Sequence, residues 1–317
     1  MMFLLVLVNV LAVAVTRANE IKRVVFSLTT HGSRIERIEH VLRHIVDQDT
    51  AELFEYRVQL NIPPSVEQIP SWMSEMKGVD IHRMPKDFGP GTFIGKQHQT
   101  PHTHTHTHMS NVASKLLGFL NPIYQQDFVK RKENLHSTLV VYGDDDIVLP
   151  SSIVLMHYEA HKQYSRDNDQ NVAFGTRRIT IGKDFGIDPA MELLEATGTI
   201  SIRADALYHV SSVLFDVTEF TDACKFSDDY WISYYFKLAQ VKLKTLSCTY
   251  DYHQNRWPGV TCGSPFHADD TISGINALSS VVVDSHGNIV PHAQGDWRVQ
   301  LRRYAMCDHI IIKNKTI

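Results

Sequence analysis

Short apolar runs alternate with segments of helical spacing along the chain. Residues 23–29 (RVVFSLT) are apolar and β-branched and predict a buried strand, whereas residues 35–46 place apolar side chains at helical spacing with charges between them. Further strands are expected at residues 56–62, 79–84 and 137–142. Strands that alternate with helices predict an α/β protein with a mainly parallel sheet, in which loops at the carboxyl ends of the strands hold the ligand.

The amino terminus has the outline of a signal peptide. Residues 3–15 are almost continuously apolar but shorter than the roughly 20 residues that span a bilayer, and small residues at Thr16 and Ala18 suit cleavage after Ala18. We therefore expect residues 1–18 to be removed and the protein to occupy the lumen of the secretory pathway (ER or Golgi) or to be secreted. A buried first strand or helix is the alternative. No other segment approaches membrane-spanning length, so no stable membrane span is expected.

The composition is that of an ordinary globular protein. Of 317 residues, 43% are hydrophobic, and 31 Lys and Arg against 35 Asp and Glu leave a net charge of -4. This balance excludes a basic nucleic-acid-binding protein and a disordered acidic one, so no nucleic-acid partner is expected. The four cysteines can pair in three ways in an oxidising compartment, and their spacing is not that of a metal finger: Cys224, Cys248, Cys262 and Cys307.

An acidic triplet, Asp144–Asp146, directly follows the apolar strand expected at 137–142. Three crowded carboxylates repel one another unless a cation neutralises them, and hard oxygen ligands of this kind suit Mn2+ or Mg2+. Such a cation can in turn hold a diphosphate. A solvated acidic turn is the alternative, but delivery of the triplet to a sheet edge by a buried strand favours a metal site.

Five segments form a more specific pattern through their order and spacing. They are VVFSLTTHGSRI from residue 24, the Gly-Pro stretch at 85–92, VVYGDDDIVLP ending at residue 150, FGTRR at 174–178 and FSDDYW at 226–231. In this order they resemble the nucleotide-sugar-dependent glycosyltransferases of the GT-A fold, a DXD-motif family of the glycosyltransferase 2-like type. The resemblance covers most of the chain after the signal peptide and implies a GT-A-like, Rossmann-type three-layer α/β/α sandwich.

The resemblance also divides the chain. Residues 20–260 are assigned to the GT-A-like domain and residues 261–317 to a lid-like or irregular C-terminal extension. Residues 93–114 interrupt the domain after its Gly-Pro stretch and include alternating His and Thr, which a repeated CA dinucleotide encodes. We interpret them as a low-complexity, His-rich insertion, after which Lys115 continues the ancestral chain from Thr92. Metal binding by these histidines is the alternative, which the entropy cost of ordering a low-complexity tract disfavours.

A donor pocket between the first strand and the acidic triplet is implied by the same resemblance. Its nucleotide-binding side chains would be Thr29, Thr30, Arg34, Lys115 and Asp145, the last of them near the ribose. Its metal ligands would be Asp144 and Asp146, directly or through water, with His253 as a candidate third ligand. A packed core histidine is the alternative for His253, because that is the commoner role of a lone His beside aromatic residues.

On the acceptor side, the resemblance implies that Asp228 and Asp229 face the attacking hydroxyl and that one of them is its general base. The alternative is purely structural. Ser227 as an N-cap with acidic residues in the first turn would favour a helix start without any catalysis. The aromatic positions that follow are expected to belong to the core.

The implied activity is transfer of a sugar from a nucleotide-diphosphate donor to a hydroxyl of a glycan, protein or lipid acceptor, assisted by Mn2+ or Mg2+. Two other classes of function stay open. One is a degenerate, non-catalytic secreted binding protein of the same fold, for which the insertion is the best support. The other is a metal-dependent phosphoester hydrolase, which would normally have further His and Asp ligands at other strand ends.

Overall fold

The computed structural model describes residues 20–30, 35–36, 38–64, 66–84, 116, 135–145, 149–165, 171–176, 178–182, 190–194, 199–207, 228–246, 281–283 and 289–291. The expected signal peptide, the insertion at 93–114 and the four cysteines lie outside the described residues. In the described parts of the chain, no helix combines the length and the apolar character needed to cross a membrane.

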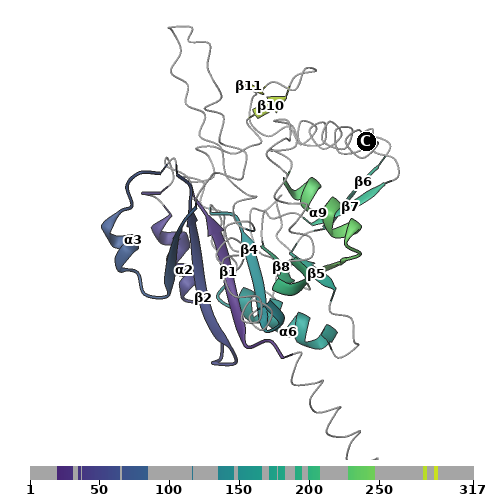
Figure 1. The fold of residues 1–317 in the computed structure, drawn as a ribbon, viewed down its shortest axis with the longest axis horizontal. Coiled ribbons are helices and arrows are strands. Elements are labelled where there is room, and N and C mark those ends of the chain that lie inside the picture. The colour runs from purple at the N-terminus through teal and green to yellow at the C-terminus, as the bar shows by residue number, and fades with distance from the viewer. Residues whose placement is uncertain are drawn as a thin grey trace, which may run out of the picture.

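A seven-stranded sheet forms the centre of the fold, in the order β3-β2-β1-β4-β8-β5-β9 (Figure 1). Neighbouring strands are parallel, except that β8 runs antiparallel to both β4 and β5. The strands are β1 (Arg23–Thr29), β2 (Glu55–Ile62), β3 (Val79–Arg83), β4 (Thr138–Gly143), β5 (Val172–Gly175), β8 (Thr199–Arg203) and β9 (Lys242–Thr245). The predicted α/β architecture with a mainly parallel sheet is therefore confirmed.

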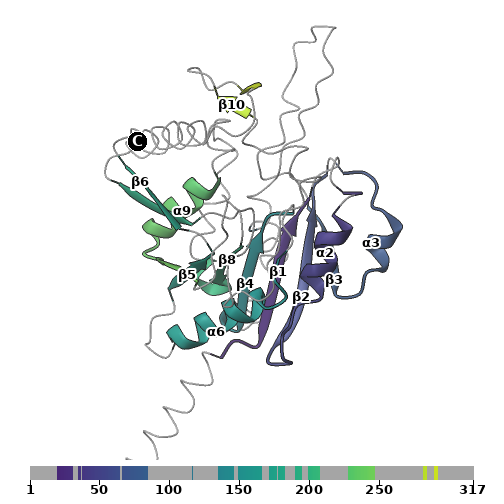
Figure 2. The same cartoon turned by 180° about the vertical axis from the view of Figure 1, so that it is seen from behind.

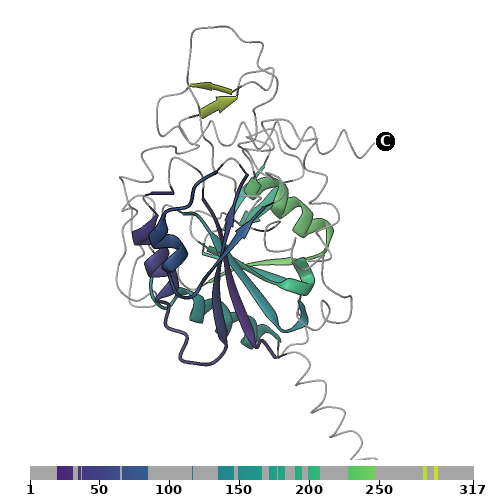
Figure 3. The same ribbon diagram turned by 60° about the vertical axis from the view of Figure 1, so that its left-hand side comes forward.

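Each face of the sheet packs against its own layer. The first face buries an apolar core against three helices, and the second buries a separate core against one helix and a hairpin. The first layer consists of α2 (Glu39–Val46), α3 (Ser71–Glu75) and α6 (Ile153–Ser165), and the second of α9 (Asp228–Leu238) with β6 (Arg178–Ile181) and β7 (Met191–Leu194). Figure 3 shows α2 on one side of the strands and α9 on the other. The result is the expected three-layer sandwich.

The central strand β1 shows why the sequence folds this way. Val24, Phe26 and Leu28 point into the core that contains α2 and α6, and Val25 points into the core that contains α9. A parallel strand covered on both faces requires a largely apolar run, and residues 24–28 supply one that only Ser27 interrupts. Figure 2 shows, from behind, that α2 and α3 lie at the β2 end of the sheet and that α9 lies at the β5 end.

Two expectations about elements need correction. The helix predicted over 35–46 begins at Glu39, because Ile35 and Ile38 are buried in turns before it and the Ile38 side chain cannot cap the first backbone N–H groups. The apolar spacing therefore extends beyond the helix itself. The C-terminal extension is not wholly irregular, since β10 (Val281–Val283) and β11 (Ile289–Pro291) pair as an antiparallel hairpin.

Candidate functional site

The strand connections define where a ligand should bind. After β1 the chain passes through α2 to β2, toward the β3 edge strand, and after β4 it passes through α6 to β5, toward the β9 edge strand. Because β1 and β4 are parallel neighbours, their carboxyl ends flank the point at which the strand order reverses. In open α/β sheets, ligands bind outside the carboxyl ends of the strands at such a point.

The end of β1 presents two buried hydroxyl groups. Thr29 is 3% exposed and Thr30 is 1% exposed, and neither Oγ1 atom has a hydrogen-bond partner in the described structure. A buried hydroxyl without a partner is costly, so such groups usually have a functional or structural explanation. Both residues were expected to line a nucleotide pocket, and both lie at the switch point.

Asn61 of β2 fixes the end of β1 from the side. Its Nδ2 donates to Ser27 Oγ at 2.9 Å and to the carbonyl of Leu28 at 3.0 Å, while its Oδ1 accepts from Gln59 Nε2 at 2.7 Å. Asn61 is fully buried, and these bonds use both amide hydrogens and the amide oxygen. Asn61 therefore holds the backbone that leads into Thr29 rather than offering a group to a ligand.

The two described acidic residues of the triplet lie at the end of β4. Ser27 pairs with Tyr142 in the β1–β4 register, and continuing this register by two residues brings Asp144 alongside Thr29. Asp144 is half-buried and Asp145 is only 3% exposed. The expectation that a buried strand delivers these carboxylates to the sheet edge agrees with the observed course of β4.

Helix α6 has a fixed starting point beside the segment that leads into β2. Gln48, between α2 and β2, accepts a hydrogen bond from the backbone N–H of Val154 at 3.2 Å and donates to the carbonyl of His44 at 2.8 Å. The backbone N–H of Asp49 also donates to the carbonyl of Ser151 at 2.7 Å. Residues 151–154, which follow the acidic triplet in the sequence, are thus tied to the segment between α2 and β2.

The amino end of α9 points toward the carboxyl edge of the sheet. The side chain of Asn171, just before β5, donates to the carbonyl of Ala239 at 2.8 Å, so the carboxyl end of α9 lies where β5 starts. An 11-residue helix is about 16 Å long, which carries its first turn toward the carboxyl ends of the strands. Asp228 and Asp229 form this first turn, and the Asp229 side chain is half-buried. Tyr230, Tyr235 and Phe236 are buried, as expected for core positions.

The remaining candidate residues cannot be placed. Arg34, Lys115, Asp146 and His253 lie outside the described residues, and so does the side chain of Asp228. Within the described residues, no group of three or more His, Cys, Asp and Glu side chains could hold a metal ion. The metal site and the general base therefore stay predictions.

Sequence reasoning missed Asn61, although a signal for it existed. In residues 55–62 (EYRVQLNI) polar residues occupy every second position, which predicts one polar face of the strand. The register places that face beside Ser27 and Thr29. The pattern could thus have indicated polar residues next to the end of β1.

Comparisons with known proteins find only distant similarity to solved structures. No model of a known protein family and no curated protein matches the chain. The following two are among the solved structures that are similar to it. One is the galactosyltransferase LgtC in complex with donor and acceptor sugar analogues, with 12% identity and a TM-score of 0.36, covering 70% of this chain and 72% of that one. The other is 4-diphosphocytidyl-2C-methyl-D-erythritol synthase from Anaerococcus prevotii DSM 20548, with 14% identity and a TM-score of 0.37, covering 82% and 98%. At these values neither structure decides the family or activity of this chain.

Proposed function

We propose that this protein is a glycosyltransferase that moves a sugar from a nucleotide-diphosphate donor to a hydroxyl group of a glycan, protein or lipid acceptor. The proposal rests mainly on what meets at the switch point. Two buried threonine hydroxyls without described partners end β1, and the carboxylates of Asp144 and Asp145 follow β4 beside them. Hydroxyl groups suit phosphate and ribose oxygens, and carboxylates suit a divalent cation. A cation-bound nucleoside diphosphate offers both partners.

The donor would be held from both strands. Thr29 and Thr30 would donate hydrogen bonds to it, and Asp145 would bind its ribose. Asp144 with Asp146 would hold Mn2+ or Mg2+, with His253 as the candidate third ligand, and when bound this ion would neutralise charge on the departing diphosphate. Arg34 and Lys115 are the proposed cationic contacts to the phosphates.

The transfer itself needs a base on the acceptor side. The acceptor oxygen would form a bond to the anomeric carbon, while the bond from that carbon to the diphosphate oxygen breaks and its electron pair leaves with the diphosphate. The hydroxyl proton would pass to Asp228 or Asp229. The orientation of α9, whose first turn extends toward the carboxyl edge of the sheet, supports this assignment.

We also propose that the protein acts in the secretory pathway or outside the cell. The apolar residues 3–15, followed by small residues at Thr16 and Ala18, support this location. Amino-terminal sequencing of the protein purified from a eukaryotic secretory host should find Asn19 as the first residue. An intact Met1 on protein retained in the cytosol would contradict the proposed location.

Calorimetric titration with uridine and guanosine diphosphosugars, with and without Mn2+, tests the activity. We expect cation-dependent binding and slow release of the sugar, and mass spectrometry of a donor and acceptor panel should then identify the product. Cation-dependent binding without turnover would instead support the degenerate binding protein. Phosphatase activity without nucleotide preference would support the hydrolase.

Removal of one metal ligand tests the site in the same titration. Asp146→Ala should abolish cation-dependent donor binding while the protein stays folded, because it removes a ligand and little apolar volume. Asp80→Ala is the matched control, since Asp80 is an exposed acidic residue on β3 whose carboxylate accepts from Arg57. Donor affinity unchanged by Asp146→Ala, or lowered equally by both variants, would refute the metal assignment.

A further inference from the structure

A line of buried polar side chains runs between α6 and β8. His157 Nε2 lies 2.8 Å from Thr199 Oγ1, and His157 Nδ1 lies 2.6 Å from Ser201 Oγ. Ser201 Oγ also lies 2.9 Å from His161 Nε2, one helical turn further along α6. All four side chains are completely buried. Two rings and two hydroxyls thus form one continuous hydrogen-bonded chain.

This line lies within an apolar environment. The core around it contains Val141, Val154 and Phe174, and the His161 ring packs edge-on against Phe174 at 4.9 Å between centroids. Burial lowers the pKa of His157 to about 3 and also lowers the pKa of His161 well below its usual value, so both rings are neutral at ordinary pH. Apolar side chains of similar volume would stabilise such a layer at least as well, because buried polar groups must first lose their hydration. The line therefore calls for an explanation other than stability.

Thr199, at one end of this line of polar side chains, joins three elements at the carboxyl edge of the sheet. In the β4–β8 ladder Thr199 pairs with Gly143, the residue directly before Asp144. Its side chain bonds to His157 on α6, the helix that begins after the acidic triplet. Its backbone N–H donates to Thr176 Oγ1 at 3.0 Å, and its carbonyl accepts from the Thr176 N–H at 3.0 Å. The strand before the carboxylates and the helix after them are thus held by the same residue.

We propose that Thr199 and His157 are positioning residues that hold Asp144 and Asp145 in place for the cation and the donor diphosphate. This inference rests on the proposed function. Seven residues, 146–152, link Asp145 to α6, so a shift of α6 against β8 would be transmitted along this segment toward both carboxylates. The hydrogen bond between His157 and Thr199 opposes that shift, because any sliding of the helix leaves a buried ring nitrogen without its partner.

Ser201, further along the same line of polar side chains, supplies a matched control. Ser201 makes the same kind of hydrogen bonds, to His157 and His161, but it pairs with Val141 in the middle of β4. Loss of either hydroxyl should lower stability by a similar amount. Only loss of the Thr199 hydroxyl should release the edge that carries Asp144.

Thr199→Val and Ser201→Ala test the proposal, with Thr199→Ser as the conservative rescue. The first measurement is hydrogen–deuterium exchange in the unliganded protein over peptides covering residues 143–153. Exchange there should speed up in Thr199→Val and stay near wild type in Ser201→Ala and Thr199→Ser. Thr199→Ala repeats the test if the valine variant does not fold. Equal exchange in Thr199→Val and Ser201→Ala would refute the positioning role of Thr199, whatever the protein binds.

The second measurement is the apparent Kd for Mn2+ in the presence of uridine or guanosine diphosphate. Supporting contacts to metal ligands typically contribute about ten- to a hundredfold to metal affinity, so Thr199→Val should raise this Kd by about tenfold or more. Ser201→Ala should change this Kd by less than about threefold, and Thr199→Ser should have a Kd close to that of the wild type. If wild-type protein binds no nucleotide in the presence of Mn2+, the proposed function fails and the exchange measurement alone judges the positioning role. An unchanged Kd in Thr199→Val would overturn the proposal while leaving the proposed function standing.

Discussion

At the scale of single residues, the hydroxyls that end β1 should separate stability from binding. Thr30 is buried and its Oγ1 has no described partner, so Thr30→Val replaces a desolvated hydroxyl with a methyl group. We expect the free energy of unfolding to stay equal or to rise by up to about 1 kcal/mol, while donor affinity falls. Urea unfolding and calorimetric titration measure the two quantities.

Ser27→Ala is the control for that substitution, because the Ser27 hydroxyl accepts a bond from Asn61. Its removal should cost about 1 kcal/mol of unfolding free energy. If Thr30→Val destabilises the protein as much as Ser27→Ala does, Thr30 has a structural partner and its assignment to the donor pocket loses its main support.

The two buried histidines predict an acid-sensitive fold. The pKa of His157 is lowered by burial from an ordinary 6.5 to about 3, and that of His161 is lowered by burial, by His157 and by Arg203. Below pH 6.5 the unfolded chain therefore binds protons that the folded chain does not. The stability contributed by each neutral ring is complete above pH 6.5 and is lost as the pH falls toward the folded pKa. For His157 this loss is about 2 kcal/mol between pH 7 and pH 5.

Urea unfolding between pH 7 and pH 5 measures the effect. His157→Gln keeps a side-chain amide near the position of one ring nitrogen and does not titrate, so its stability should fall about 2 kcal/mol less than that of the wild type over this range. Equal pH dependence in the two proteins would show that His157 does not titrate differently in the folded and unfolded states.

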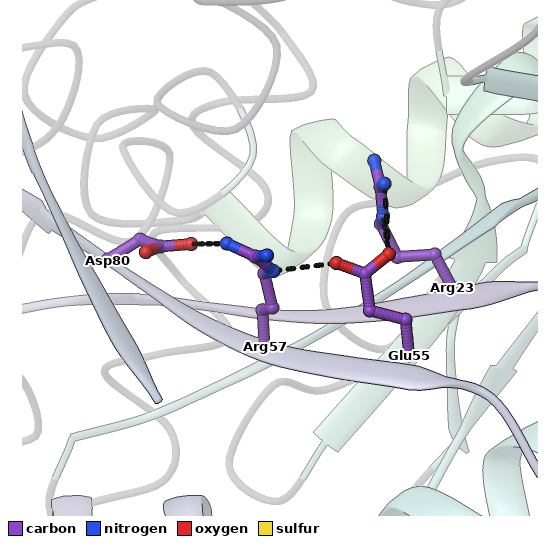
Figure 4. A network of polar contacts seen from close by, with 4 residues as sticks. All are labelled: Arg23, Glu55, Arg57 and Asp80. Atoms are coloured by element: carbon purple, nitrogen blue, oxygen red, sulfur yellow. Dashed lines mark hydrogen bonds and ion pairs between the residues drawn. The ribbon is translucent and has the colours of Figure 1, made fainter. Parts of the chain in front are cut away.

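At the scale of elements, β1 and β2 carry a surface ladder of charges (Figure 4). Arg23 donates to Glu55 at 3.0 Å, Glu55 accepts from Arg57 at 2.7 Å, and Arg57 reaches Asp80 of β3 at 3.3 Å. Burial raises the pKa of Glu55, but the bonds from both arginines outweigh it, and the pKa is lowered overall. The ladder lies in the amino-terminal half of the strands. Ser27 and Asn61 lie on the same face of the sheet, closer to the carboxyl ends of the strands.

This ladder should contribute little to stability. Its side chains are 39–60% exposed, so Arg57→Ala should lower the free energy of unfolding by at most about 1 kcal/mol, and the difference should shrink in high salt. Phe26→Ala, on the buried face of β1, should cost about 3–5 kcal/mol regardless of salt. Chemical denaturation at low and high ionic strength measures both. A large, salt-independent effect of Arg57→Ala would show that the guanidinium has a packing role.

The elements that sequence could predict are those whose burial follows from their own residues. Residues 23–29 and 138–143 are apolar enough to specify buried strands, and their ends placed Thr29 and Asp144 at one edge correctly. Strand β8 (TISIR) is not among the predicted strands, and its alternation would in any case indicate a half-exposed strand, whereas all five residues are buried. Its polar side chains are compatible with burial because His157 and His161 bond to them from about 40 positions away in the chain. No local pattern contains that information, whereas the alternation of residues 55–62 did carry a signal for the polar face on which Asn61 lies.

At the scale of the whole molecule, the strand order shows how much chain the connection from β3 to β4 needs. The two strands are parallel and lie three positions apart in the sheet. With about 4.8 Å between neighbouring strands, the link must cross about 14 Å and return along one strand length. Residues 84–92 and 115–137 alone exceed this at about 3.3 Å per extended residue. The insertion at 93–114 is therefore not needed to connect the sheet.

Deletion of residues 93–114 should consequently leave the fold intact. Closing a loop costs only about 0.6 kcal/mol for each doubling of its length, so shortening this connection should change the free energy of unfolding by less than about 1 kcal/mol. The alternating His and Thr offer no apolar periodicity that a core requires. Donor affinity should stay the same or rise, because Lys115 would again follow the Gly-Pro stretch directly. Urea unfolding and calorimetric titration of the deletion variant measure both quantities. Collapse of the folded protein on deletion would show instead that the segment packs against the domain, and Lys115 would then have to reach its proposed phosphate contact by another path.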